Sequence, residues 1–227
     1  MKHKNTSPDY HPPLHAGYFY HVYNRTNNKE LLFCEDHDRL YFLERIQIYL
    51  SPYVDIFAYC LLGNHFHILI QVKSVKDIAT VIENVNDRER TIAQKTFLEL
   101  NPYVRPVEKI MESQFLRFFT SYSMYFNARY QRQGNLFTRR FKRILVEDDS
   151  YLLRLVYYIH ANPVKHGLVN DFRTYQWSSY HSILSKDPSS LQREAVLNWF
   201  EGKESFLEFH QQESDYDEEL KNYLIEE

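Results

Sequence analysis

The chain has 227 residues, of which 44% are hydrophobic and 16% aromatic, so it can bury a core and is not a disordered protein. It contains only five glycines and no GxGxxG or GxxxxGK[ST] string, which disfavours nucleotide-binding loops. The formal net charge of −3 is uneven: residues 201–227 hold ten Asp and Glu and two Lys, a balance of −8, which leaves +5 for residues 1–200. The acidic end is either a solvated helix or a tail that folds over a basic binding surface.

The sequence has neither of two apolar patterns that indicate a membrane or secretory protein. No apolar run approaches the roughly 20 residues that span a bilayer, and residues 1–16 have no apolar core of the signal-peptide kind. The two cysteines, Cys34 and Cys60, form no CxxC pair and no disulfide framework. We therefore expect a cytoplasmic protein with no membrane contact.

Hydrophobic periodicity predicts alternating strands and helices. In chain order the pattern predicts a strand at 17–26, a helix at 34–51, strands at 53–62 and 65–72, one or two helices within 74–110, a long helix at 111–131, a strand at 139–147 and a helix at 148–163. Asp36 or Asp38 is the expected cap of the first helix, and Pro163 is expected to limit the last one. A turn at Gly63-Asn64 joins the second and third strands.

The order β-α-β-β-α-β followed by further helices indicates an α+β fold. It is typical of a ferredoxin-like or RRM-like antiparallel sheet with helices on one face, here with extra C-terminal helices. We expect a flexible N-terminal arm at 1–16, one domain at 17–184 and an acidic helical tail at 185–227. The fold alone indicates no function, because this topology hosts many.

Two histidines lie one residue apart in the strand at 65–72. Side chains in a strand alternate between faces, so His65 and His67 share a face while Phe66 points to the other. A single strand histidine is most often a hydrogen-bonded packing residue, but two on one face beside a turn are also a plausible metal pair. Two imidazoles are too few for a closed structural zinc site and suit an open catalytic ion.

A tyrosine-rich helix follows the last strand and could contribute a nucleophile. It carries Tyr151, Tyr157 and Tyr158, and in a chain with 19 tyrosines each is most simply a packing residue. Asn162 lies one turn after Tyr158 and therefore on the same helix face. A tyrosine hydroxyl is a poor nucleophile at neutral pH, but a nearby cation would favour its phenolate and so attack on a phosphodiester.

Residues 129–143 combine six Arg and Lys with Tyr130, Phe137 and Phe141 and contain no acidic residue. Bare charge could be a solvated face. Cations that follow phosphates and rings that stack on bases are together what single-stranded nucleic acid requires. The stretch lies between the long helix and the tyrosine helix, which favours a nucleic-acid partner.

Three ordered motifs, "GNHFHILI", "GNLFTRRFK" and "YYIHANPVKHGLV…YQWSSY", resemble the single-tyrosine HUH transposases, and most closely the REP-associated tyrosine transposases. "YHVYNR" at 20–25 also looks like the first strand of that family. The resemblance extends over about 17–184, with 74–110 the least matched part. It implies an HUH endonuclease domain at 17–184 and a single-stranded DNA substrate that carries a hairpin or palindrome.

The resemblance also implies roles for particular residues. His65 and His67 would bind a divalent ion, and Tyr158, four residues before Asn-Pro, would cut single-stranded DNA and leave a 5′-phosphotyrosine link. Asn162 stands where the family often has Gln as the third ligand. We expect Mg²⁺ or Mn²⁺ as cofactor, with Mn²⁺ bound more tightly by imidazoles, and no nucleotide cofactor. The expected DNA contacts are Arg139, Arg140, Lys142 and Arg143, with Arg25 and Arg132 as weaker candidates.

Two other functions stay open at this point. One is a domesticated, non-catalytic binding module of the same fold, for which "YFYHVY" could supply the aromatic platform of an RRM. The other is a metal-dependent hydrolase with water as nucleophile, disfavoured because no HExxH string or carboxylate cluster occurs. The chain could act as a monomer or as a homodimer.

Overall fold

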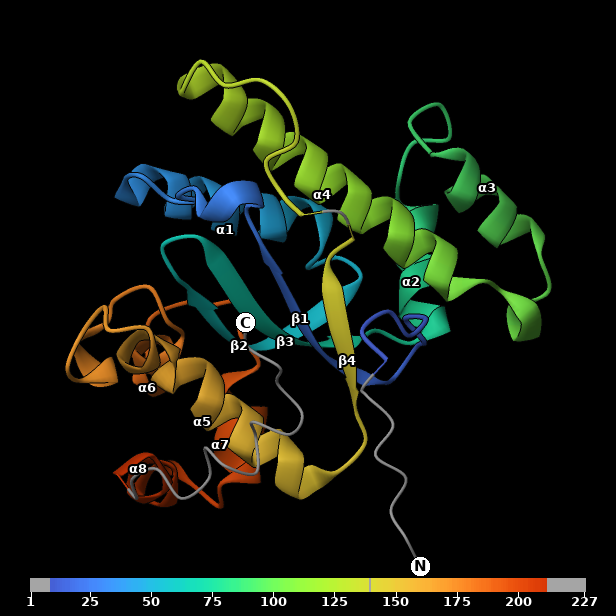
Figure 1. Cartoon of the computed structure of the whole chain (residues 1–227). Helices are drawn as coiled ribbons and strands as arrows, with labels where there is room; N and C mark the ends of the chain where they lie inside the picture. Colours follow the sequence, from blue (N-terminus) through green and yellow to red (C-terminus); the bar gives the residue numbers. More distant parts are fainter. Residues whose placement is uncertain (1–8, 139, 212–227) are drawn as a thin grey trace, which may run out of the picture.

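A computed structural model describes residues 9–138 and 140–211 of the chain (Figure 1). Four antiparallel strands form one sheet in the order β2-β3-β1-β4. The strands are β1 (Phe19–Arg25), β2 (Val54–Leu61), β3 (His65–Val72) and β4 (Lys142–Val146). The β2–β3 hairpin lies on one side of β1 and β4 on the other, as in a ferredoxin-like fold. The expected fold class is confirmed.

Helices cover both faces of this sheet (Figure 1). The helices are α1 (Asp36–Tyr49), α2 (Val75–Glu83), α3 (Ile92–Glu99), α4 (Val107–Arg129), α5 (Asp149–Lys165), α6 (Tyr180–Leu184), α7 (Arg193–Trp199) and α8 (Lys203–Gln211). Short 3₁₀ helices are η1 (Asn27–Lys29), η2 (Pro102–Val104) and η3 (Phe172–Thr174). The two helices of the ferredoxin-like unit, α1 and α4, share one face as expected. The opposite face is covered by α5 and the additional C-terminal helices.

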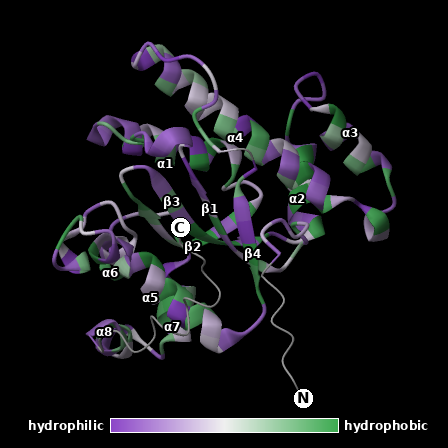
Figure 2. Ribbon diagram, viewed as in Figure 1, coloured by the Kyte–Doolittle hydropathy of each residue, from purple (hydrophilic) through white to green (hydrophobic). Residues whose placement is uncertain are grey.

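The period of two along the strands produces two separate cores. On β3, Phe66, Ile68 and Ile70 are buried against α1 and α4, whereas Leu69 is buried on the side of α5. The flanking helices carry both apolar and polar residues, which gives the mixed colouring of Figure 2. The sheet is therefore nearly dry on both faces, and a polar group on either face needs a specific partner.

The buried carboxylate of Asp38 fixes the start of α1, but not as the predicted N-cap residue. The N-cap is Glu35, not Asp36 or Asp38, and Asp38 at the third helical position accepts from the backbone N–H groups of Cys34 and Glu35 at 2.8 and 2.9 Å. This is a capping box, in which the side chain reaches back to the helix start. Asp38 is fully buried.

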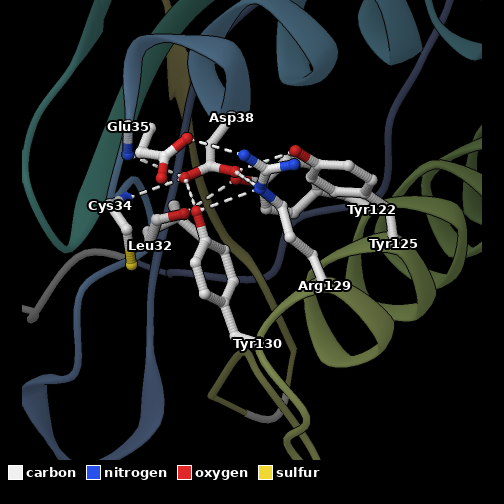
Figure 3. A network of polar contacts seen from close by, with 8 residues as sticks. All are labelled: Leu32, Cys34, Glu35, Asp38, Tyr122, Tyr125, Arg129 and Tyr130. Carbon is white, nitrogen blue, oxygen red and sulfur yellow. Dashed lines mark hydrogen bonds and ion pairs between the residues drawn. The ribbon is translucent and has the colours of Figure 1, made fainter.

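The same carboxylate joins α1 to the end of α4 (Figure 3). The hydroxyls of Tyr125 and Tyr130 donate to Asp38 at 2.9 and 2.8 Å, and Arg129 lies 3.8 Å from Asp38 and 2.6 Å from Glu35. Hydrogen bonds to a buried charged acceptor are the strong ones. This network fixes the point at which α4 passes into the basic stretch 129–143.

Helix α5 begins as expected and extends further than expected. The Asp148 side chain accepts from the N–H groups of Ser150 and Tyr151 and caps its start. Pro163 does not end the helix, which continues to Lys165. Proline removes only one hydrogen bond this close to the end, and the N–H of His166 still donates to the Asn162 carbonyl at 3.0 Å. Asn162 is therefore helical.

Both ends of the chain are packed where the structure describes them. In the expected flexible arm, Leu14 is buried and the Tyr20 hydroxyl donates to the Pro13 carbonyl at 2.8 Å. In the expected tail at 185–227, Val196 of α7 and Phe206 of α8 are fully buried in the core beside α5. Residues 9–16 and 185–211 thus belong to the domain. Residues 1–8 and 212–227, which hold most of the acidic end, lie outside the described part of the chain.

Candidate functional site

The two histidines of β3 lie on the face of the sheet that α5 covers. In the β1–β3 register, His67 is opposite Tyr23 and His65 is opposite Arg25. Their ring centroids are 5.3 Å apart, and Phe66 is fully buried in the core on the other face. The sheet thus brings the two imidazoles together, as strand alternation predicted.

Each histidine of the pair has its Nδ1 atom engaged by a neighbour. His65 Nδ1 lies 2.6 Å from the Oδ1 atom of Asn64, in the β2–β3 turn. His67 Nδ1 lies 2.9 Å from Nε2 of His21 on β1. The Nε2 atom of His67 is buried and has no hydrogen-bond partner within residues 9–138 and 140–211. In both rings Nε2 is left as the nitrogen for a ligand.

Burial keeps these imidazoles neutral. It lowers the pKa of His65 to about 3, helped by electrostatic interaction with His166 and Arg25, and it lowers the pKa of His67 well below its usual value, helped by His21 and His65. Burial alone lowers the pKa of His21 to about 3. Neutral imidazole is the form that binds metal ions.

Helix α5 presents Tyr158 to this cluster. The Tyr158 ring lies edge-on to the His67 ring at 5.7 Å and to the His21 ring at 6.1 Å between centroids. Its neighbour Tyr157 lies against Phe172 and His210. Adjacent helix residues diverge by about 100°, so only one of the two tyrosines can face the histidines. Tyr158 is the one that does.

One face of α5 continues this contact toward the end of the helix. Residues 158, 162 and 166 are one turn apart, and the His166 ring lies 4.6 Å from the His65 ring between centroids. Asn162 lies between the two contacts and is fully buried, with Nδ2 donating to the Tyr158 carbonyl at 2.9 Å. Its Oδ1 atom has no hydrogen-bond partner among the residues described.

These groups fit a divalent ion. Two neutral imidazoles with Nε2 available and one unpaired amide oxygen, on His65, His67 and Asn162, are a chemically suitable donor set. Over the described ranges, no group of three or more His, Cys, Asp and Glu could hold a metal ion. Among the described residues, the amide oxygen of Asn162 is thus the further side-chain ligand that we consider for an ion on the histidine pair.

Residues of the cluster line two separate pockets. His65, His67 and His166 line a pocket of about 270 Å³ together with Arg25 and Lys142. Tyr158 and Asn162 line a second pocket of about 820 Å³, beside Lys165 and Arg173. The Lys165 ammonium lies 4.9 Å from the centre of the Tyr158 ring. Tyr158 itself is only 2% exposed.

The expected DNA-contacting residues are not equivalent. Arg25 and Lys142 lie at the histidine pocket, and Arg140 is exposed at the end of a groove beside α4. Arg132 is paired with Glu30 at 2.5 Å, and Arg143 donates to the Pro12 carbonyl at 2.5 Å. These two side chains have structural partners. The expectation for Arg139 lies outside the described residues.

Sequence reasoning missed His21, His166 and Asn64. His21 is in the alternating strand "GYFYHVYNRT", where its parity with Tyr23 and Arg25 would have placed it on the histidine face. His166 is one turn after Asn162, a spacing that would have aligned it with Tyr158. Asn64 was assigned only to a turn.

Two further observations concern the described residues. None of their helices is long and apolar enough to cross a membrane. Cys34 is exposed and Cys60 is buried, and both are free thiols.

Comparisons with known proteins give one sequence relative. No protein-family model matches the chain. A solved structure of a REP-associated tyrosine transposase bound to a REP hairpin aligns with 78% of this chain and 86% of that chain, with a TM-score of 0.47 and 15% identity. A Haemophilus influenzae protein named as a REP-associated tyrosine transposase is 27% identical over 156 residues, which are 61% of this chain and 74% of that protein. The chain is thus related in sequence to a protein named as a REP-associated tyrosine transposase, which confirms the resemblance that its motifs indicated.

Proposed function

We propose that the protein cuts and rejoins single-stranded DNA next to a hairpin, with Tyr158 as nucleophile. The observation that carries the proposal is the contact of Tyr158 with His67, while Tyr157 faces away. A tyrosine beside two neutral imidazoles is a workable arrangement for attack on a phosphodiester. The relationship to a protein named as a transposase supports the same reaction class.

The proposed step exchanges one phosphodiester for another. The Tyr158 oxygen loses its proton to solvent and bonds to phosphorus, and the bond from phosphorus to the 3′-oxygen breaks. That oxygen takes up a proton and leaves as a 3′-OH, while a 5′-phosphotyrosine remains. A 3′-OH from another DNA end can reverse the step, so joining needs no nucleotide cofactor. Because Tyr158 is 2% exposed, the hydroxyl must become accessible when DNA binds.

His65, His67 and Asn162 are the proposed holders of Mg²⁺ or Mn²⁺. When bound, the ion would polarise the scissile phosphate and favour the phenolate. The residues themselves keep the site dry and neutral: His65 and His67 offer unprotonated nitrogens, and Asn162 also bonds the Tyr158 carbonyl. Lys165 places a positive charge beside the Tyr158 ring, which also favours the phenolate.

A groove beside α4 offers a path for the DNA strand. It has a volume of about 760 Å³ and is lined by Phe119, Phe137, Phe141 and Arg140. Asn24 and Thr138 line both this groove and the histidine pocket, so the two are adjacent. Rings and a cation in one groove suit unstacked bases and their phosphates.

The test uses labelled single-stranded DNA from the flanks of the protein's own gene, with Mn²⁺ or with EDTA, on a denaturing gel. We expect a nick and a protein-linked species with Mn²⁺ only. Tyr158→Phe should abolish both and retain DNA binding. Tyr157→Phe, on the same helix, is the matched control and should still cut. If Tyr157→Phe lost cleavage while Tyr158→Phe still cut the DNA, Tyr158 would be excluded as the nucleophile.

The alternative is a non-catalytic binding module of the same fold. Its supporting observation is the low exposure of Tyr158, which such a module would leave unused. It predicts DNA binding without a nick across every flanking palindrome, with or without Mn²⁺.

A further inference from the structure

His21 is a buried histidine that the proposed reaction does not use directly. It is fully buried on β1, on the same sheet face as His67, and its Nε2 lies 2.9 Å from His67 Nδ1. The two rings are nearly parallel, with an interplanar angle of 20°. In a neutral imidazole one ring nitrogen donates and the other accepts, so a single proton lies between His21 Nε2 and His67 Nδ1.

The shared proton can lie on either ring, and the two states differ at the site. If His21 Nε2 carries it, His67 accepts through Nδ1 and must hold its own proton on Nε2, which blocks that nitrogen as a ligand. If His67 Nδ1 carries it, Nε2 of His67 has a lone pair. Nε2 of His67 and Nδ1 of His21 are both buried without a partner within the described ranges, so each state leaves one N–H group unpaired and hydrogen bonding by other residues does not choose between them.

The tautomer of His65 indicates which of the two tautomers to expect for His67. Its Nδ1 faces Oδ1 of Asn64, an atom that only accepts, so the proton of His65 is on Nδ1 and the lone pair is on Nε2. Metal-binding histidines commonly donate their second ring N–H to a fixed acceptor, which sets the tautomer. His21 contacts Nδ1 of His67, as Asn64 contacts Nδ1 of His65.

We propose that His21 is a positioning residue that accepts the Nδ1 proton of His67 and so holds Nε2 of His67 ready for a metal ion. This inference rests on the proposed function, because it assigns a device to the same metal site. His21 then carries its own proton on Nδ1, an atom with no hydrogen-bond partner among the described residues.

The first test reads the tautomer without metal. Long-range ¹H–¹⁵N spectra of the full chain at neutral pH distinguish a protonated ring nitrogen from an unprotonated one. We expect His67 to carry its proton on Nδ1. A wild-type His67 protonated on Nε2 would overturn the inference, whatever the enzyme does with DNA.

The second test measures Mn²⁺ binding by calorimetry. His21→Phe keeps a ring but removes the acceptor, and it should weaken Mn²⁺ binding by about 10- to 100-fold. His21→Gln offers an amide oxygen as acceptor and should retain most of the affinity. If wild type and His21→Phe bound Mn²⁺ equally while His67→Ala lost binding, the role of His21 would be refuted and the metal site would stand. Unchanged binding in His67→Ala would instead refute the proposed metal site.

A folding defect in His21→Phe is recognised separately. Far-UV circular dichroism and thermal unfolding of both His21 variants precede the titrations. If His21→Phe does not fold, the wild-type tautomer decides the question, because it needs no substitution.

Discussion

Replacing Asp38 by Ala should destabilise the protein more than any other single change at the start of α1. The carboxylate accepts from two backbone N–H groups and from the hydroxyls of Tyr125 and Tyr130. A hydrogen bond to a charged group contributes about 1.5–3 kcal/mol, and the contributions are not additive when donors regain water. Tyr125 and Tyr130 are only half-buried and regain water, so we expect a loss of about 3–5 kcal/mol, less than the sum of the four hydrogen bonds.

Equilibrium urea unfolding measures this change. Asp36→Ala is the matched control, because Asp36 lies in the same helical turn but makes only an exposed 3.4 Å pair with Arg39. Its loss should stay below about 0.5 kcal/mol. Asp38→Asn keeps the shape and one acceptor and should fall between the two. A loss below about 1 kcal/mol in Asp38→Ala would refute the reasoning that this network joins α1 to α4.

Three further predictions concern the site and its surroundings. Replacing both Arg140 and Lys142 by Ala should weaken single-stranded DNA binding and lower the slope of log affinity against log salt concentration by about 1.4. Arg132→Ala should leave the slope unchanged, because the Arg132 side chain is already paired with Glu30. Fluorescence anisotropy at several salt concentrations measures both slopes. Asn162→Ala should lower Mn²⁺ affinity on the order of tenfold by calorimetry, and an unchanged affinity would exclude its amide oxygen as a ligand. The free energy of unfolding should fall as the pH is lowered from about 6.5 to 4, because burial lowers the pKa of His210 to about 4 and the unfolded chain takes up the proton first. The fall should be up to about 1.4 kcal/mol per pH unit for each such histidine. It should be smaller in His210→Gln, and an equal fall in that variant would contradict the prediction.

The sheet and the position of the histidine pair could be predicted from local pattern. Alternation of apolar residues defines the strands, and the parity of residues 65 and 67 follows directly from the strand period. Helix ends were less predictable, because they depend on single hydrogen bonds. Asp38 serves as the third residue of a capping box and not as the cap, and Pro163 is tolerated because so few hydrogen bonds follow it.

Contacts between distant segments could not be predicted from one sequence. The pairing of His21 with His67 joins residues 46 positions apart and depends on the register of β1 with β3. The packing of α7 and α8 into the core beside α5 was hidden by the acidic composition of the chain end. Likewise, Arg143 was predicted as a DNA contact and Arg132 as a weaker one, although the Pro12 carbonyl engages Arg143 and Glu30 engages Arg132.

The account depends most directly on Tyr158 as the group that becomes linked to DNA. Full-length protein incubated with single-stranded DNA and Mn²⁺, digested with nuclease and protease and analysed by mass spectrometry, would locate the nucleotide remnant among the 19 tyrosines. The account predicts the remnant on Tyr158 and its loss when His67 is replaced by Ala. A remnant on Tyr157 or on any tyrosine away from His65 and His67 would contradict it.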